Sequence, residues 1–155
     1  MQGNPQVIEA LNRLLTGELT AIDVYFLQAR LFQDWGYNKL FERFAHEKQD
    51  EEGHATEIID RILFLEGTPN VQDRLGFKVE TDIRALLQMD LELEYDVARS
   101  LNEALALCRE HGDNATRELL ERLLVDTEQD HIFWLESQLQ IIDSIGLEKY
   151  LPEQF

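Results

Sequence analysis

Apolar residues recur along the chain at alternating steps of four and three residues, the spacing that places side chains on one face of an α-helix. The pattern extends over four segments, at roughly residues 5–35, 38–66, 82–111 and 114–145. In the first segment the repeating positions are Leu11, Leu15, Glu18, Ile22, Tyr25, Ala29 and Phe32. A repeat sustained over this length predicts four long helices that pack together as a bundle.

Residues that start and stop helices separate the four segments. Asn4 before Pro5 is typical of a helix start, and Asn38 is expected to cap the second helix. All four segments are followed by a glycine: Gly36, Gly67, Gly112 and Gly146. The first and third connections are short, which favours antiparallel neighbours, whereas residues 67–81 can cross the length of the bundle. We therefore expect one all-α domain over residues 1–155, with a long crossover between helices two and three and a short fifth helix from residue 147.

Each apolar stripe is interrupted by an acidic residue near the middle of its helix. The four interrupting residues are Glu18, Glu51, Glu94 and Glu128. Because the midpoints of bundled helices coincide, these carboxylates should meet at one level. Two of them are followed three residues later by a histidine on the same helix face, His54 and His131. Buried carboxylates need compensating charge, and these oxygen and nitrogen donors suit two divalent cations, iron or manganese, with zinc as a competitor.

The charge of the chain also favours a cationic ligand. Its 31 acidic and 14 basic residues give a net charge of −17, which disfavours nucleic acid and anionic membranes as partners and attracts cations. Apolar runs such as Ala104–Cys108 are far shorter than the ~20 residues that cross a bilayer. Cys108 is the single cysteine, so no internal disulfide is expected, and no signal peptide is visible. The cytoplasm is the expected location.

Nearly the whole chain resembles the bacterioferritin branch of the ferritins. The stretches that carry the resemblance are LLTGEL at 14–19, DEEGHA at 50–55, RILFLEG at 61–67, DLELE at 90–94, EQDHIFWLE at 128–136 and GLEKYL at 146–151. The resemblance implies a ferritin-like four-helix bundle, a hollow 24-mer, and iron storage as a ferric mineral. It also implies ferroxidase activity, which oxidises Fe²⁺ with O₂ or H₂O₂, and a small ferredoxin as a partner for iron release.

The resemblance further implies roles for individual residues. Six residues would form a di-iron centre, with Glu51 and Glu128 as bridging ligands, Glu18 and His54 completing one iron, and Glu94 and His131 completing the other. His46 and Asp50 match positions that bind a further iron on the inner surface in some members. Tyr25 and Trp134 match aromatic electron donors beside the centre, while Ile58 replaces a third aromatic residue.

The sequence departs from the haem-binding members of this branch at one position. Those members carry a methionine between the glutamate and histidine ligands of the second helix, and here that position is Glu52. The chain has only Met1 and Met89, and neither matches. We expect no haem site built from this subunit alone, so the protein is either a haem-free ferritin or a subunit of a mixed shell with a haem-binding partner.

Two other functions could use the same six proposed ligands. The first is a dimeric di-iron oxidase or peroxide-reducing enzyme, which the lone Cys108 disfavours because no cysteine pairs are present for a rubredoxin-like site. The second is a non-catalytic bundle that only buffers metal ions.

Overall fold

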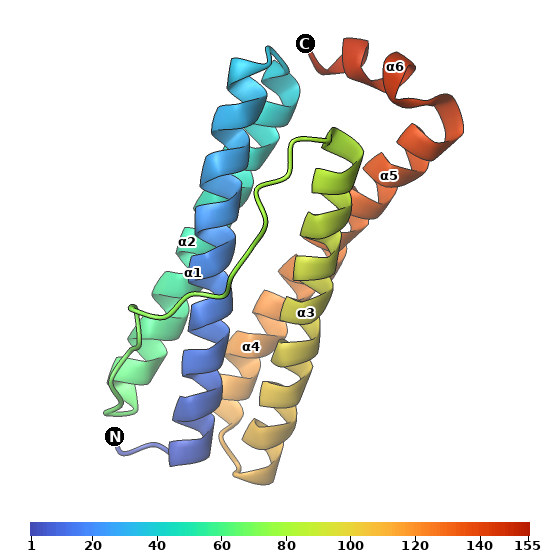
Figure 1. Cartoon of the computed structure of the whole chain (residues 1–155). Helices are drawn as coiled ribbons and strands as arrows, with labels where there is room; N and C mark the ends of the chain where they lie inside the picture. The colour runs from blue at the N-terminus through green and yellow to red at the C-terminus, as the bar shows by residue number, and fades with distance from the viewer.

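The computed structural model describes residues 1–155, and its regular secondary structure consists only of helices (Figure 1). Its helices are α1 (Pro5–Asp34), α2 (Asn38–Phe64), α3 (Ile83–Glu110), α4 (Asn114–Asp126), α5 (Phe133–Ile145) and α6 (Leu147–Tyr150). A π-helical turn, Thr127–Ile132, joins α4 to α5, and a short 3₁₀ turn, Leu151–Gln154, follows α6. The predicted all-α class, the four long helical segments and the short C-terminal helix are confirmed.

The long crossover gives the bundle its topology. In Figure 1 the crossover leaves the end of α2 near the N-terminus and runs along α1 to the opposite end, where α3 begins. Helices α2 and α3 therefore run in the same direction, while α1 with α2 and α3 with α4 form antiparallel pairs. The predicted order of short, long and short connections is confirmed. No helix is both long enough and apolar enough to cross a membrane.

Side-chain caps fix where two of the long helices begin. The Asn4 side chain accepts a hydrogen bond from the backbone N–H of Gln6 at 2.8 Å and so caps α1. Asp82 caps α3 in the same way by accepting from the backbone N–H of Ala85 at 2.8 Å. The predicted Asn38 cap is wrong: Asn38 is the first residue inside α2, and Tyr37 precedes the helix without a side-chain cap.

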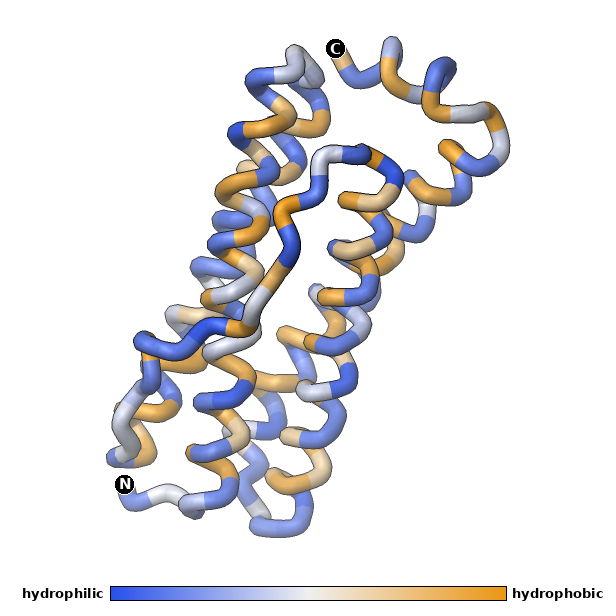
Figure 2. Tube along the Cα trace, in the orientation of Figure 1, coloured by the Kyte–Doolittle hydropathy of each residue, from blue (hydrophilic) through white to orange (hydrophobic).

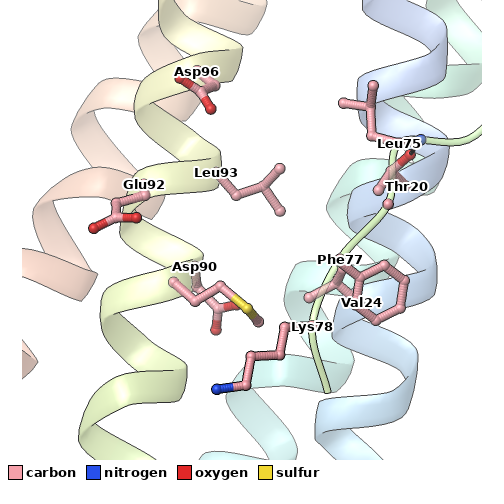
Figure 3. A pocket seen from close by; sticks show the side chains of 11 residues that line it. Thr20, Val24, Leu75, Phe77, Lys78, Asp90, Glu92, Leu93 and Asp96 are labelled. Atoms are coloured by element: carbon pink, nitrogen blue, oxygen red, sulfur yellow. Dashed lines mark hydrogen bonds between the residues drawn. The ribbon is translucent and has the colours of Figure 1, made fainter. Parts of the chain in front are cut away.

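The crossover is fastened to α1 by polar contacts. The Thr20 hydroxyl accepts a hydrogen bond from the backbone N–H of Leu75 at 2.9 Å, and the Asn12 side chain accepts one from the backbone N–H of Asn70 at 2.7 Å. Beneath the crossover lies a pocket of about 340 Å³ between α1 and α3 (Figure 3). Asp90 on α3 contributes to its wall.

The interior consists of two apolar clusters with a polar layer between them. Each cluster contains 16 buried apolar residues, one around Leu11, Ile62, Leu101 and Leu120, and the other around Phe32, Leu40, Leu87 and Leu139. The polar layer comprises the buried residues Glu18, Glu47, Glu51, His54, Asp90, Glu94 and His131. Figure 2 shows hydrophilic and hydrophobic positions mixed along the helices, as expected for helices with one buried face. The buried charge predicted from the interrupted stripes thus lies between two apolar ends.

Candidate metal centre

Five of the six predicted ligands meet inside the bundle. Glu18 comes from α1, Glu51 and His54 from α2, Glu94 from α3 and His131 from the π-helical turn, and each is at most 6% exposed. They form two groups that could each hold a cation, Glu18–Glu51–His54 and Glu51–Glu94–His131. In each group the potential ligand atoms lie within 4.8 Å of one another. Glu51 belongs to both groups, as a bridging carboxylate would.

The two oxygens of Glu51 face different histidines. Oε2 of Glu51 lies 3.5 Å from Nδ1 of His54, which is also 3.8 Å from Oε2 of Glu18. Oε1 of Glu51 lies 3.0 Å from Nδ1 of His131, and this Nδ1 is 3.4 Å from Oε1 of Glu94. The two imidazole rings are nearly parallel, with centroids 6.0 Å apart. Both histidines therefore present Nδ1 to the shared carboxylate.

Several of these atoms are buried without a hydrogen-bond partner. They include both carboxylate oxygens of Glu18 and the Nδ1 atoms of His54 and His131. An unpaired buried polar atom costs on the order of 1–3 kcal/mol, and a buried carboxylate more. Oxygen and imidazole donors that converge in this state fit a divalent cation, which would coordinate them and balance their charge.

Burial and neighbouring charges shift the pKa values of these groups. Burial, reinforced by the charge of Glu51, raises the pKa of Glu94. Burial also opposes ionisation of Glu51, but the imidazoles of His131 and His54 close to its carboxylate outweigh it and lower the pKa of Glu51. The pKa of Tyr25, whose hydroxyl donates a hydrogen bond to Glu94, is raised well above its ordinary value, chiefly by burial. Without metal, the raised pKa values of Glu94 and Tyr25 thus favour the protonated forms of these two groups.

The predicted inward placement of Glu128 is wrong. Glu128 is exposed and belongs to neither ligand group, whereas its neighbour Thr127 is buried and donates its hydroxyl to the backbone oxygen of Leu123 at 2.9 Å. In an α-helix, residues three apart lie about 60° apart around the axis. The wider π-helical turn rotates Glu128 away from His131. The sequence contained an indication that Thr127 rather than Glu128 faces inward, because Thr127, His131 and Leu135 recur at steps of four residues.

The structure also adds acidic neighbours that sequence reasoning did not select as site residues. Glu47, Asp50 and Asp130 form a third group around His131, whose Nε2 is 2.9 Å from Oε2 of Glu47. His46 is more than half exposed, and its Nε2 lies 3.3 Å from Oδ2 of Asp50. His46 and Asp50, which the resemblance assigns to a further iron, thus lie next to each other, and Asp50 also lies close to His131 of the buried centre.

His54 has a comparable acidic neighbour in Asp126, the last residue of α4. Its Nε2 is hydrogen-bonded to Oδ2 of Asp126 at 3.3 Å. Both residues line a pocket of about 610 Å³ without any hydrophobic residue in its wall. This pocket connects the edge of the centre to the surface between α2 and α4, and Asp50 and Asp130 also line it.

The two aromatic residues selected from the sequence have a neighbour in common. Tyr25 and Trp134 both pack edge-on against Phe44, with ring centroids 5.7 and 5.9 Å from it. Ile58 is fully buried in the apolar cluster around Leu11. The position of the absent third aromatic residue is therefore filled by aliphatic packing.

Glu52, at the position where haem-binding members have methionine, lies on the exposed side of α2. Its carboxylate is 2.6 Å from Nζ of Lys48. The same ammonium group lies 5.4 Å from the ring centroid of Phe26 on α1. The exposed surface of α2 at this position therefore carries the Lys48–Glu52 ion pair.

A helical bundle with carboxylate–histidine groups in its core is the arrangement of the ferritin-like proteins. The family model that matches the chain is the ferritin-like domain, over residues 8–145. Bacterial ferritins from Synechocystis sp. and Pseudomonas aeruginosa are each 47% identical to the chain over 154 residues, which is 99% of both sequences. A bacterioferritin from Mycolicibacterium paratuberculosis is 43% identical over 97% of this chain and 94% of its own length. The chain belongs to the ferritin family, in its bacterial ferritin and bacterioferritin branch.

Proposed function

We propose that this protein stores iron and that its buried centre is a ferroxidase, with Fe²⁺ as substrate. The observation that supports this most directly is the pair of ligand groups that share Glu51, with unpaired buried donor atoms in each. Membership in the ferritin family, shared with relatives named bacterial ferritin, supports iron as the metal. The net charge of −17 favours accumulation of cations at the protein.

The proposed reaction oxidises two Fe²⁺ ions held side by side. Together they supply two electrons to one H₂O₂, which takes up two protons and becomes two waters, or to one O₂, which with two protons becomes H₂O₂. Glu18, Glu51 and His54 would hold one ion, and Glu51, Glu94 and His131 the other. Carboxylate oxygens favour the ferric product because they are hard, charged ligands.

An aerobic Fe²⁺ titration followed by absorbance tests the ferroxidase. Glu94→Ala, Glu18→Ala and His131→Ala should each abolish the fast oxidation phase while the fold persists, because each removes a proposed ligand. Glu92→Ala is a matched control, because Glu92 is exposed on the same helix as Glu94 and belongs to no ligand group. Wild-type rates in the three ligand variants would refute the proposal. Fe²⁺ binding without oxidation in the wild-type protein would instead identify a metal buffer.

We also propose assembly into a hollow 24-mer that encloses a ferric mineral. The short helix α6 supports this, because it packs beyond the end of the bundle rather than within it (Figure 1). Light scattering should give a mass about 24 times that of the 18.1 kDa subunit. A dimer at all concentrations would refute the shell and favour the dimeric oxidase. A cytoplasmic location and a ferredoxin for iron release complete this proposal.

The absence of a haem site built from this subunit is a further part of the proposal. The salt bridge of Glu52 with Lys48 supports it, because this pair offers haem iron no thioether ligand. Protein expressed alone and supplied with haem should contain no stoichiometric haem, whereas a mixed shell would acquire it from a partner subunit. Glu52→Met should begin to create a site. One low-spin haem for every two wild-type subunits would refute this point.

A further inference from the structure

Each histidine of the centre lies between the shared ligand and a second carboxylate. Nδ1 of His54 faces Glu51, while its Nε2 is hydrogen-bonded to Asp126. Nδ1 of His131 also faces Glu51, while its Nε2 is 2.9 Å from Oε2 of Glu47. Neither Glu47 nor Asp126 belongs to the two ligand groups around Glu51. A carboxylate thus lies beside Nε2 of both histidines; Asp126 is hydrogen-bonded to His54, whereas Glu47 is close to His131 without a hydrogen bond.

A neutral imidazole carries its proton on one nitrogen and can bind a metal only through the other. A carboxylate beside Nε2 accepts that proton in a hydrogen bond, which leaves the Nδ1 lone pair free and fixes the direction of the ring. We propose that Glu47 and Asp126 are positioning residues that hold His131 and His54 with Nδ1 directed toward the metal ions. This inference rests on the proposed metal centre and assigns neither residue as a ligand.

The two positioning carboxylates differ in how firmly they are held. The Glu47 side chain is only 5% exposed, and its Oε1 lies 2.5 Å from the guanidinium of Arg43. Arg43 also bonds to Asp130 at 2.9 Å and lies over the ring of Trp134. The Asp126 side chain is 61% exposed at the edge of the polar pocket. Water can replace Asp126 beside His54, whereas it cannot readily replace Glu47.

The π-helical turn is what allows Asp126 to take this position. Residues five apart on an α-helix lie about 140° apart around the axis, so Asp126 and His131 would face different directions. A π-helical turn bonds residue i to residue i+5 and places them one above the other. Both residues can therefore face α2, where His54 and Glu47 lie.

Co²⁺ binding to the metal-free assembled protein, followed by visible absorption, tests this inference. Glu47→Ala should weaken Co²⁺ binding at one of the two sites by about 10- to 100-fold and shift its absorption bands, because the ring of His131 loses its orientation. Glu47→Gln should lose less, since its amide oxygen still accepts a hydrogen bond. Asp126→Ala should weaken binding by only a few fold. Glu42→Gln, an exposed change of the same charge on α2, is the matched control.

The outcomes separate this inference from the proposed function. If the wild-type protein binds no Co²⁺, the metal centre itself is refuted. If it binds Co²⁺ and Glu47→Ala binds equally well with unchanged bands, only the positioning role is refuted. Loss of a whole Co²⁺ equivalent in both Glu47→Ala and Glu47→Gln, with the bands of the remaining ions unchanged, would also overturn it, because Glu47 would then be a ligand. Retention of the melting temperature in the variants shows that the fold is intact.

Discussion

The two apolar clusters and the polar layer between them contribute to this protein in opposite ways. Each cluster buries 16 apolar residues, and Leu11, Leu101 and Leu120 are fully inaccessible to solvent. The polar layer is buried to the same extent, yet it contains unpaired carboxylate oxygens such as those of Glu18. Burial therefore stabilises the bundle at its ends and opposes folding in its middle, as long as no cation is bound.

This difference indicates how stability and function are divided along the bundle. At each end, an apolar cluster joins residues from all four long segments of the bundle. The middle can then contain like charges that would repel one another in a less stable scaffold. Substitutions in the clusters should consequently lower the stability of the metal-free protein, whereas substitutions in the polar layer should preserve or raise it and reduce metal binding.

The largest stability effect is expected in an apolar cluster. Leu101→Ala removes a fully buried side chain and should lower the free energy of unfolding of the metal-free protein by about 2.7–5 kcal/mol, because it leaves a cavity. Chemical denaturation of wild type and variant measures this difference. The exposed Leu63 on α2 provides a matched Leu→Ala control that should change stability far less. Equal losses at both positions would contradict the assigned core.

Without metal the polar layer lowers the free energy of unfolding, and metal binding should make the layer raise it instead. Co²⁺ at about 100 times its dissociation constant should stabilise the folded protein by about 2.7 kcal/mol per site, because it binds the folded state alone. Glu51→Ala should lose most of this gain, since Glu51 belongs to both groups. Melting curves with and without Co²⁺ give the comparison. An equal rise in melting temperature for Glu51→Ala would show that Co²⁺ binds elsewhere.

The pH dependence of the free energy of unfolding should show how much the burial of Asp90 destabilises the folded protein. Burial raises the pKa of Asp90 well above its ordinary value. The folded protein therefore keeps a proton that the unfolded chain releases above pH ~3.9, and the free energy of unfolding falls as pH rises from there toward the raised pKa. Asp90→Asn cannot ionise and keeps an oxygen that accepts the hydrogen bond from Gln28, which is 2.8 Å long in the wild type.

The metal-free Asp90→Asn variant should thus be more stable than the wild type at neutral pH, by on the order of 1 kcal/mol. The advantage should shrink as pH falls toward 4. Urea denaturation at several pH values measures it. Asp96→Asn is the control, because Asp96 is exposed on the same helix and pairs with Arg99. A constant difference between Asp90→Asn and the wild type across pH would mean that Asp90 is already ionised in the folded state.

Much of the fold and most of the centre followed from residue spacing alone. Long helices with few breaks leave little choice of topology, and a buried acid in an apolar stripe is conspicuous, which identified Glu18, Glu51 and Glu94. Spacing failed at residues 127–132 because it assumes one constant period, and a single π-helical turn changes that period locally. It also could not identify Glu47 as a neighbour of His131, since that contact depends on side-chain packing between α2 and the turn.

Glu128 provides the smallest expected effect and the sharpest test of that local change. Glu128 is the acid of the fourth stripe, and a regular helix would place it in the centre beside His131. The structure leaves it exposed and outside both ligand groups. Glu128→Ala should therefore change the free energy of unfolding by no more than about 0.5 kcal/mol and leave the Fe²⁺ oxidation rate within about twofold of wild type. Glu51→Ala, assayed in parallel by stopped-flow absorbance, should lose the fast phase. Loss of that phase in Glu128→Ala as well would mean that metal binding rewinds the turn to a regular helix and brings Glu128 inward as a second bridge. Deleting Gln129 separates these cases further, because it shortens the turn by one residue. If the π-helical turn is the form that binds iron, the deletion should impair oxidation even though it restores the regular spacing between Asp126 and His131.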